Sequence, residues 1–423
     1  MRTIHELITR QSVERPEMPF LRFEGNIISF SELRQRVSSV SAVLREIGVK
    51  SGDRVGLMMT NHPDHVIIYL ALAWLGAISV EVATDLNIGG IQLQLHDAEP
   101  QFFIVESQFV PEVKAVLEEL RFVGLRILVR DAAKLNLERP FHSLRLDQPF
   151  ATCEAFSATL DRIHTISYAS GTVEGAKGTV LTERFVQIGA NSAAVLADVR
   201  DNDVLFLWEP FCHNLGWTSV LIALQHGISI ALVECCSGSK CWDQIRESGA
   251  TILHYFGGAM NILLERPPQP NDRDNSIRVA WGATAPKASR RIFQERFGIT
   301  VRECYGLSEP QNVTHLNLEG RLGSIGKPIE DLFECWIIGE DGKKLPNGEI
   351  GEIVVRPKLP GIVMRGYFRD PKRTAEVLRD GCVYTGDLGY QDNEGFFFAL
   401  VARRAACGGV EKTFLHKRII VHI

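Results

Sequence analysis

The chain has 423 residues, of which 45% are hydrophobic, and its formal net charge is -5 at pH 7. This length allows a large core and two or more subdomains, and the interspersed charges give no support for binding nucleic acid or an anionic membrane. Residues 1–10 lack the apolar core of a signal peptide and the apolar run Val66 to Val80 is too short to span a bilayer, so we expect a cytoplasmic protein.

The N-terminal part alternates helix and strand patterns. Ser29 to Glu32 has capping-box spacing, and apolar residues recur at helical intervals from Leu33 to Ile47, before Gly48. A second helix is expected from Pro63 through Trp74. The expected strands are Val55–Met59, Ile78–Val82, Phe102–Val105 and Arg126–Val129. The polar, proline-containing stretch 131–159 predicts a seam between subdomains.

The segment Ile166 to Val180 carries the main functional prediction. Ile163 to Tyr168 has the pattern of a short strand, and glycines, hydroxyls and a lysine follow it before a helical pattern begins near Thr182. Glycines let backbone N–H groups face an anion, hydroxyls add donors, and a lysine supplies positive charge. We predict a phosphate-binding loop between a strand and a helix, with Ser170, Gly171, Thr172, Lys177 and Gly178. The alternative is a surface loop of small residues with a solvated lysine.

This loop differs from that of the nucleotide hydrolases. Their pattern requires glycine directly before the lysine, whereas here Ala176 precedes Lys177 and Gly178 follows it.

The rest of the chain predicts a doubly wound region followed by a small β-rich one. Strands are expected at Val204–Trp208, Ser229–Val233, Thr251–Tyr255, Ile277–Trp281 and Val301–Cys304, alternating with helices at Gly216–Gln225, Trp242–Ser248 and Lys287–Phe297. From Gly323 on, short strands such as Cys335–Ile338 and Glu349–Arg356 alternate with turns. We therefore expect an α/β fold with two doubly wound α/β subdomains (1–150 and 151–322), a small β-rich subdomain (323–398) and a divergent tail (399–423).

The nine cysteines show no paired spacing of the kind that binds zinc. Cys235, Cys236 and Cys241 come closest, but no second pair or histidine cluster accompanies them. We expect buried, reduced thiols rather than a metal site.

Several motifs occur in an order that resembles the adenylate-forming, or AMP-binding, superfamily. The loop is similar to its phosphate loop, T-S-G-T-T-G-x-P-K-G, at Ser170, Gly171, Thr172, Lys177 and Gly178. Its Y-G-x-T-E motif resembles Tyr305-Gly306-Leu307-Ser308-Glu309. The resemblance implies that Tyr305 stacks on adenine, that Ser308 contacts phosphate and that Glu309 helps to hold Mg²⁺. An aromatic residue and a glutamate beside an ordinary turn are the alternative.

Three further motifs extend the resemblance. Gly282-Ala283-Thr284-Ala285-Pro286 is similar to the adenine-pocket segment, although a tight strand-to-helix turn also explains it. Tyr384-Thr385-Gly386-Asp387 resembles Y/H-T-G-D, whose aspartate binds both ribose hydroxyls; two carboxylate oxygens suit a vicinal diol. Pro210-Phe211-Cys212-His213 resembles a segment whose histidine lies near the acyl pocket, and a structural histidine is the alternative.

The resemblance implies an acyl-CoA synthetase. A small carboxylic acid attacks the α-phosphorus of ATP, giving an acyl adenylate and pyrophosphate, and CoA then forms the thioester. The implied catalytic residues are Lys177, Thr172, Glu309 and His213, with Thr172 and Glu309 on Mg²⁺. Either Arg403 or the neighbouring Arg404 is the implied ribose arginine. No general base is needed, because the attacking carboxylate is already ionised.

The finer resemblance is to the carnitine and crotonobetaine CoA ligases, through Glu394–Phe398 and Pro371–Ala375. Five aromatic residues could then form a cage for a quaternary ammonium, although core packing also explains them: Trp208, Trp217, Tyr255, Phe256 and Trp281. The identity of the acid and the oligomeric state stay open.

The chain also departs from the superfamily pattern. The superfamily continues after T-G-D into a mobile domain of roughly a hundred residues, and nothing in 405–423 matches it. Glu174 adds a negative charge to the phosphate loop, and Ala176 replaces a proline. We therefore expect a truncated ligase impaired in thioester formation. The rival hypothesis is a non-catalytic protein that binds a nucleotide or an acyl adenylate.

Overall fold

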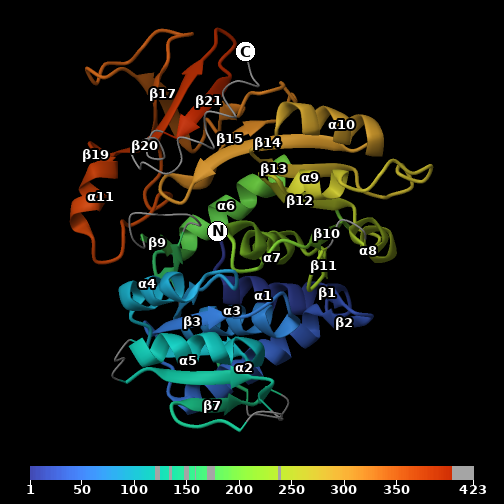
Figure 1. Cartoon of the computed structure of the whole chain (residues 1–423), viewed down its shortest axis with the longest axis vertical. Helices are drawn as coiled ribbons and strands as arrows, with labels where there is room; N and C mark the ends of the chain where they lie inside the picture. The colour runs from blue at the N-terminus through green and yellow to red at the C-terminus, as the bar shows by residue number, and fades with distance from the viewer. Residues whose placement is uncertain are drawn as a thin grey trace.

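The computed structural model of the protein describes residues 1–119, 124–132, 136–146, 152–157, 159–168, 177–236 and 240–402. The described strands form three sheets, flanked by helices (Figure 1). The helices are α1 (Ile4–Glu14), α2 (Phe30–Ile47), α3 (Pro63–Leu75), α4 (Ile88–Ala98), η1 (Ser107–Phe109), α5 (Val110–Glu119), α6 (Glu183–Leu196), α7 (Asn214–His226), α8 (Cys241–Ser248), α9 (Ala259–Leu264), α10 (Lys287–Phe297) and α11 (Pro371–Val377).

The first sheet is parallel except at one edge. Its strands are β3 (Arg54–Met58), β4 (Ile78–Glu81), β5 (Phe102–Glu106), β6 (Arg126–Arg130), β7 (Phe141–Leu144), β8 (Ile163–Tyr168) and β9 (Gly178–Thr182). Their order is β7-β6-β5-β3-β4-β8-β9, and only the last pair is antiparallel among the described strands of this sheet.

The second sheet has a parallel centre. Its strands are β1 (Pro19–Phe23), β2 (Asn26–Ser29), β10 (Val204–Leu207), β11 (Ser229–Leu232), β12 (Ile252–Phe256), β13 (Val279–Ala283), β14 (Thr300–Leu307), β15 (Gln311–Asn317) and β16 (Lys327–Pro328). The order is β16-β15-β14-β13-β12-β10-β11-β1-β2, with antiparallel strands at both ends.

The third sheet is small and antiparallel, and it lies at the top of the molecule in Figure 1. Its strands are β17 (Phe333–Ile338), β18 (Gly351–Pro357), β19 (Leu378–Arg379), β20 (Cys382–Gln391) and β21 (Phe397–Ala402). The expected fold class, two α/β layers and a small β-rich part, is thus confirmed.

The two large sheets exchange strands across the predicted boundary at residue 150. β1 and β2 come from the N-terminal segment but join the second sheet, while β8 and β9 come from the following segment and join the first. Each large sheet is therefore built from residues on both sides of position 150. The division into subdomains at 150, 322 and 398 stays a prediction.

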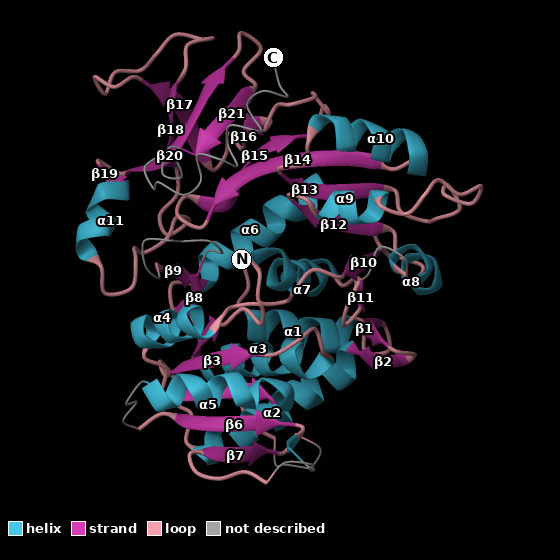
Figure 2. Ribbon diagram, viewed as in Figure 1, coloured by secondary structure: helices cyan, strands magenta, loops and turns pink. Residues whose placement is uncertain are grey.

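Helices α6 and α7 lie between the two large sheets (Figure 2), and they pack against each other in the largest apolar cluster. Trp217, Val220 and Leu221 of α7 and Phe185 of α6 are buried in it. Removing one such side chain from water contributes about 1.5–3 kcal/mol, so this cluster fixes the two sheets relative to each other. No helix within the described ranges is long and apolar enough to cross a lipid bilayer.

Local signals explain several helix ends. Ser29 accepts a hydrogen bond from the backbone N–H of Glu32, whose carboxylate accepts one from the N–H of Ser29, so the predicted capping box begins α2. Gly48 ends the same helix with φ 110°, a left-handed conformation that glycine adopts without steric cost.

Three local expectations are wrong. A strand, β9, lies between the predicted phosphate loop and the helix expected near Thr182, which is α6 and does begin there, at Glu183 with Thr182 as its N-cap. Tyr305 and Gly306 lie inside β14 rather than after a strand end. Cys236 and Cys241 form a disulfide, and Cys235 is exposed, so these three are not buried reduced thiols.

Candidate active site

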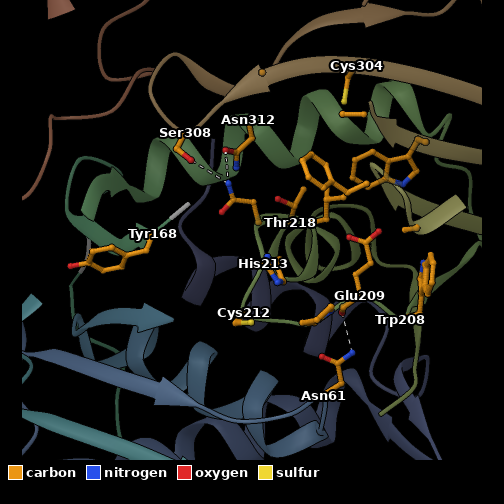
Figure 3. Close-up of a pocket in the computed structure, with 18 of the residues that line it drawn as sticks. Asn61, Tyr168, Trp208, Glu209, Cys212, His213, Thr218, Cys304, Ser308 and Asn312 are labelled. Carbon is orange, nitrogen blue, oxygen red and sulfur yellow. Dashed lines mark hydrogen bonds between the residues drawn. The ribbon is translucent and has the colours of Figure 1, made fainter. Parts of the chain in front are cut away.

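A cavity of about 810 Å³ lies where the parallel strands of the two large sheets end. Residues at the carboxyl ends of strands from both sheets line it: Thr60 after β3, Thr84 after β4, Tyr168 in β8, Trp208 after β10, Phe256 in β12 and Ala283 in β13. Ligands of α/β proteins bind at this edge because the loops there are free to vary without disturbing the sheet. Figure 3 shows Trp208 and Glu209 on the opposite side of this cavity from Tyr168 and Ser308.

Glu309 lines the cavity from the turn between β14 and β15. The hydroxyl of Tyr367 donates a hydrogen bond to its carboxylate, and the backbone N–H of Met364 donates to its carbonyl over 3.0 Å. The same segment continues to Phe368, whose N–H donates to the carbonyl of Gly178. The start of β9, directly after Lys177, is therefore tied to the segment that holds Glu309.

Lys177 is half-buried and is not among the residues that line the cavity. Its neighbours Ser170, Gly171 and Thr172 lie outside the described residues, as does Arg403. Their expected roles in binding phosphate, Mg²⁺ and ribose stay predictions.

Asp387 lines the cavity and accepts a 2.7 Å hydrogen bond from the hydroxyl of Tyr305. The two residues come from different sheets, because Tyr305 lies in β14 and Asp387 in β20. Tyr305 is buried, and both burial and the nearby Asp387 carboxylate raise the pKa of its phenol well above 10.0, so it is a hydrogen-bond donor at neutral pH.

A β-bulge aims Asp387 at the cavity. Tyr384 and Leu388 of β20 pair with Val354 and Glu352 of β18. Three residues of β20 lie between the paired positions, where β18 has only Ile353. Gly386, in the middle of this insertion, has φ 74°. A bulge of this kind bends the strand and re-aims a side chain, and glycine allows the left-handed backbone.

Side chains hold the bulge in place. The Thr385 hydroxyl donates to the carbonyl of Ile353 over 2.8 Å and accepts from the N–H of Asp387 over 3.1 Å. The N–H of Gly386 donates to a carboxylate oxygen of Glu352 over 2.9 Å. The Thr-Gly-Asp motif is thus a fixed part of the third sheet rather than a loose turn.

The segment Gly282 to Thr284 ends β13 close to the cavity. A side chain at Gly282 would have its Cβ 1.8 Å from the carbonyl oxygen of Tyr255 in β12, so only glycine fits between the two strands. Ala283 lines the cavity, and Thr284 has φ 62°. The glycine of the segment that resembles an adenine pocket therefore also has a packing cause.

His213, which Figure 3 labels, is the N-cap residue of α7 and lines the cavity, as does Asn214, the first residue of the helix. Burial lowers the pKa of His213, although Asp85 partly opposes this, so the imidazole is neutral at pH 7. Asn214 accepts a 3.1 Å hydrogen bond from Ser167 of β8, and its amide donates to Ser308 and Asn312 over 3.4 and 3.3 Å. Asn214 thus links β8, the strand before the predicted phosphate loop, to the Tyr-Gly-Leu-Ser-Glu motif.

Asn61 holds together the side of the cavity that Glu209 lines. Its amide nitrogen donates to the carbonyls of Glu209 and Val233, and its oxygen accepts from the N–H of Phe211 over 2.7 Å. The sequence reasoning missed Asn61, Asn214, Glu209 and Tyr367. Glu209 and Asn214 flank the Pro-Phe-Cys-His motif, and their positions at a strand end and a helix start were the available signal.

Only part of the expected aromatic cage lines the cavity. Trp208, Phe256 and Trp281 do, whereas Trp217 is packed in the largest apolar cluster. Tyr255 of β12 is buried in a second apolar cluster, and its hydroxyl donates to the carbonyl of Arg302. Within the described part of the chain, no group of three or more His, Cys, Asp or Glu side chains is arranged to hold a metal ion.

The described site has the motifs of a known enzyme family in one cavity: Glu309, Asp387, Ser308, Gly306, Ala283 and His213. The model of one family, the AMP-binding enzymes, matches residues 8–368 of the chain. The chain belongs to the AMP-binding enzyme family. The predicted family is therefore confirmed.

Curated relatives point to the same branch of this AMP-binding family. The crotonobetaine/carnitine–CoA ligase of Shigella dysenteriae is 30% identical over 385 residues, which cover 88% of this chain and 74% of that protein. The ligase of the same name from Escherichia coli O157:H7 is 29% identical over 390 residues, 89% of this chain and 74% of that protein. These relatives are acyl-CoA synthetases, so the family is one of acid–thiol ligases, as expected.

Solved structures of AMP-binding enzymes share the fold. A protein described as a putative long-chain-fatty-acid CoA ligase from Rhodopseudomonas palustris has a TM-score of 0.81 and 22% identity, over 94% of this chain and 98% of that one. The o-succinylbenzoate CoA synthetase of Bacillus subtilis, solved with its acyl-adenylate intermediate, has a TM-score of 0.81 and 24% identity. The match covers 94% of this chain and 78% of that one.

Proposed function

We propose that this AMP-binding enzyme uses ATP to convert a small carboxylic acid into an acyl adenylate, which then passes to CoA. The observation that carries the proposal is that Glu309 and Asp387, from two different sheets, line one cavity, with Tyr305 bonded to Asp387. The relatives are named as CoA ligases of small acids, which supports the same reaction class.

In this proposal the nucleotide lies along the Tyr305 and Asp387 side of the cavity. Asp387 accepts hydrogen bonds from the ribose hydroxyls, since its second carboxylate oxygen complements the one that Tyr305 already bonds. The base lies against the small Ala283 at the end of β13, where no large side chain blocks its approach. Ser308, held by Asn214, donates to phosphate.

The proposed chemistry requires positioning more than proton transfer. The acid attacks as an ionised carboxylate, so the protein needs no base. Neutral His213 donates a hydrogen bond to this carboxylate and adds no charge that would hold it back from the phosphate. Lys177 offsets the negative charge that develops on the phosphates, a role that calls for its ammonium group to reach them from the start of β9.

A magnesium ion fits this donor set. Mg²⁺ in nucleotide sites is bound by one or two protein carboxylates together with phosphate oxygens and waters, and a cage of several acidic residues is not required. Glu309 provides a carboxylate at the cavity wall, and Thr172 is proposed as the second protein ligand. When bound, the ion neutralises phosphate charge.

The acid is proposed to lie on the side of Trp208 and Glu209, opposite Ser308 in Figure 3. The names of the relatives make small acids such as carnitine the first ones to test.

Pyrophosphate exchange into ATP tests the proposal. Exchange above background with any acid of a panel supports adenylation, and thioester formation with CoA in the same assay tests the expected impairment of that step. A rise in Tm with AMP, together with no exchange for any acid, would instead favour the non-catalytic nucleotide-binding protein.

A further inference from the structure

The wall of the cavity contains a disulfide that the proposed reaction does not use. Cys236, which follows β11, is half-buried and lines the cavity. Its sulfur is bonded to that of Cys241, the first residue of α8. The preceding residue, Cys235, carries a free, exposed thiol and also lines the cavity. Oxidised and reduced cysteines therefore lie next to each other at the candidate active site.

This disulfide does not belong to a framework of disulfides. Every other cysteine of the described chain is free: Cys153, Cys212, Cys235, Cys304, Cys335 and Cys382. The bonded pair is separated by only 5 positions in the sequence, and the stabilisation that a disulfide gives increases with the length of the loop that it closes. In proteins whose other cysteines stay reduced, a disulfide is usually catalytic or redox-sensing.

The two bonded sulfurs differ in how easily they are reached. Cys241 is completely buried, with Trp242 and Ile245, in the second apolar cluster, and it does not line the cavity. Helix α8, which carries all three, packs beside β10 (Figure 1). Exchange between a thiol and a disulfide requires access to the sulfur that is attacked. A thiol that enters the cavity therefore meets Cys236 and not Cys241.

Cys236 lies near the proposed place of the acid. The amide of Asn61 donates to the carbonyls of Glu209 and Val233 over 3.0 and 3.1 Å, so it joins the end of β10 to the segment that carries Cys236. Glu209 and Cys236 both line the cavity. A group attached to Cys236 would therefore take up space on the side where the acid is proposed to lie.

We propose that Cys236 is a covalent modification site for small thiols, which open the Cys236–Cys241 disulfide from the cavity and stay attached to Cys236. The attachment is inferred from the disulfide and its position alone. Its effect on activity rests, in addition, on the proposed adenylation of an acid.

The exchange needs no oxidant. The thiolate of the entering molecule attacks the sulfur of Cys236, a new S–S bond forms, and the bond to Cys241 breaks. The electron pair of that bond leaves with the sulfur of Cys241, which then takes up a proton. One disulfide is replaced by another, so the protein gains one whole thiol molecule without net oxidation.

Burial of Cys241 should slow the reverse reaction. Only the thiolate attacks a disulfide, and a thiol in apolar surroundings keeps its proton. Burial raises the pKa of Cys304, another buried thiol of this chain, to about 12. The same effect is expected for Cys241 once it is released, so the attached thiol should persist.

The carboxyl groups near Cys236 do not exclude an entering thiolate. Burial raises the pKa of Glu209 to about 8, so this group is mostly uncharged at pH 7. Glu234 is exposed, and solvent screens its charge.

Mass spectrometry of the full chain, purified without reductant, tests the modification. One equivalent of reduced glutathione or of CoA is added in the absence of oxygen. A free cysteine cannot gain a thiol under these conditions, because that reaction needs an acceptor for the two electrons released. We expect the mass to rise by one whole thiol molecule, and peptide mapping should place that molecule on Cys236.

The two thiols distinguish the source of the modifying group. Uptake of CoA but not glutathione would identify the thiol substrate of the proposed reaction as the source, whereas uptake of both would show that small thiols in general react. Uptake of neither overturns the proposal. It is also overturned if the purified protein lacks the disulfide, or if the disulfide is reduced and no thiol stays attached.

A pair of variants separates Cys236 from Cys241. Both carry Cys235→Ser, which removes the exposed thiol, and both are treated with oxidised glutathione. With Cys241→Ser, the free thiol of Cys236 in the cavity wall should take up one glutathione. With Cys236→Ser, the buried Cys241 should react about tenfold more slowly or less. Equal reactivity of Cys236 and Cys241 would overturn the assignment.

Two controls accompany these variants. Cys235→Ser alone should take up reduced glutathione as the wild type does, because it keeps the disulfide. Uptake that depends on Cys235 would move the site to that residue and overturn the proposal. Urea unfolding checks that each variant is folded, and the mapping on the wild type does not depend on any variant.

Pyrophosphate exchange measures the effect on the cavity. Attached glutathione should lower exchange by about tenfold or more for any acid that is a substrate, and dithiothreitol, which removes it, should restore the rate. Unchanged exchange in the modified protein would show that the attached thiol lies outside the path of the acid and overturn this effect. If no acid supports exchange, the adenylation proposal fails, whereas the mass measurement still decides the modification of Cys236.

Discussion

The hydroxyl of Tyr305 donates a 2.7 Å hydrogen bond to Oδ2 of Asp387, across two sheets of the protein. β14 supplies the tyrosine and a bulge of β20 supplies the aspartate. Because Tyr305 holds one carboxylate oxygen, the orientation of the other is restricted before any nucleotide binds. This restriction reduces the entropy lost on binding.

Substitution of Asp387 tests this arrangement. Asp387→Asn keeps the shape but removes the charge, and hydrogen bonds to a charged group are worth about 1.5–3 kcal/mol. We expect KM for ATP to rise by about 10- to 100-fold, while KM for the acid changes little. Tyr305→Phe, which only releases the carboxylate, should cause a smaller rise. An unchanged KM for ATP in Asp387→Asn would show that Asp387 does not contact the nucleotide.

Gly386→Ala tests whether the bulge positions Asp387. Gly386 has φ 74°, where a side chain costs about 1–2 kcal/mol, so urea unfolding should show a loss of this size. Relief of the strain should also turn Asp387 away and raise KM for ATP. Gly342→Ala is the matched control, because Gly342 has φ 76° and open space around it. It should lose similar stability with no change in KM, and equal kinetic effects in both variants would contradict the positioning role.

The regular elements could be predicted from the sequence because their signals are local. The helix expected at Lys287–Phe297 is α10, and the capping box at Ser29 begins α2. Motif order also identified Glu309, Asp387 and His213, which share the cavity.

The missed features depend on partners far along the chain. Asn61 bonds Glu209 and Phe211, about 150 residues away. Strand β9 is short and pairs with β8, which lies on the other side of the predicted loop, so only its β-branched residues Thr179, Val180 and Thr182 signalled it in the sequence. Likewise, the bulge at Asp387 exists only against β18, and the sequence Thr-Gly-Asp by itself reads as a turn.

Glu309→Gln tests the proposed magnesium ligand. Loss of the charge should weaken binding of the metal with ATP, so the Mg²⁺ concentration for half-maximal exchange should rise by about tenfold or more. Chelation of the metal should abolish exchange in the wild type. Glu349→Gln, at an exposed position, should leave the Mg²⁺ titration unchanged. An identical titration for Glu309→Gln and the wild type would remove Glu309 from the metal site.

His315 should make the fold sensitive to acid. It packs edge-on against Tyr305 and Phe397, and complete burial lowers its pKa from 6.5 to about 3. In the unfolded chain His315 therefore binds a proton near pH 6.5, whereas in the folded protein it binds one only near pH 3. Falling pH favours unfolding between these two values, because the unfolded state binds more protons there.

The contribution of His315 can be measured by urea unfolding at several pH values. Each such group costs about 1.4 kcal/mol of unfolding free energy per pH unit between about pH 6 and pH 4. In His315→Gln the slope of stability against pH should be shallower by about this amount, because the residue no longer titrates in the unfolded chain. His142→Gln, at an exposed position of β7, should keep the wild-type slope. A wild-type slope in His315→Gln would mean that the histidine is protonated in the folded protein, and hence that water or an acidic group reaches it.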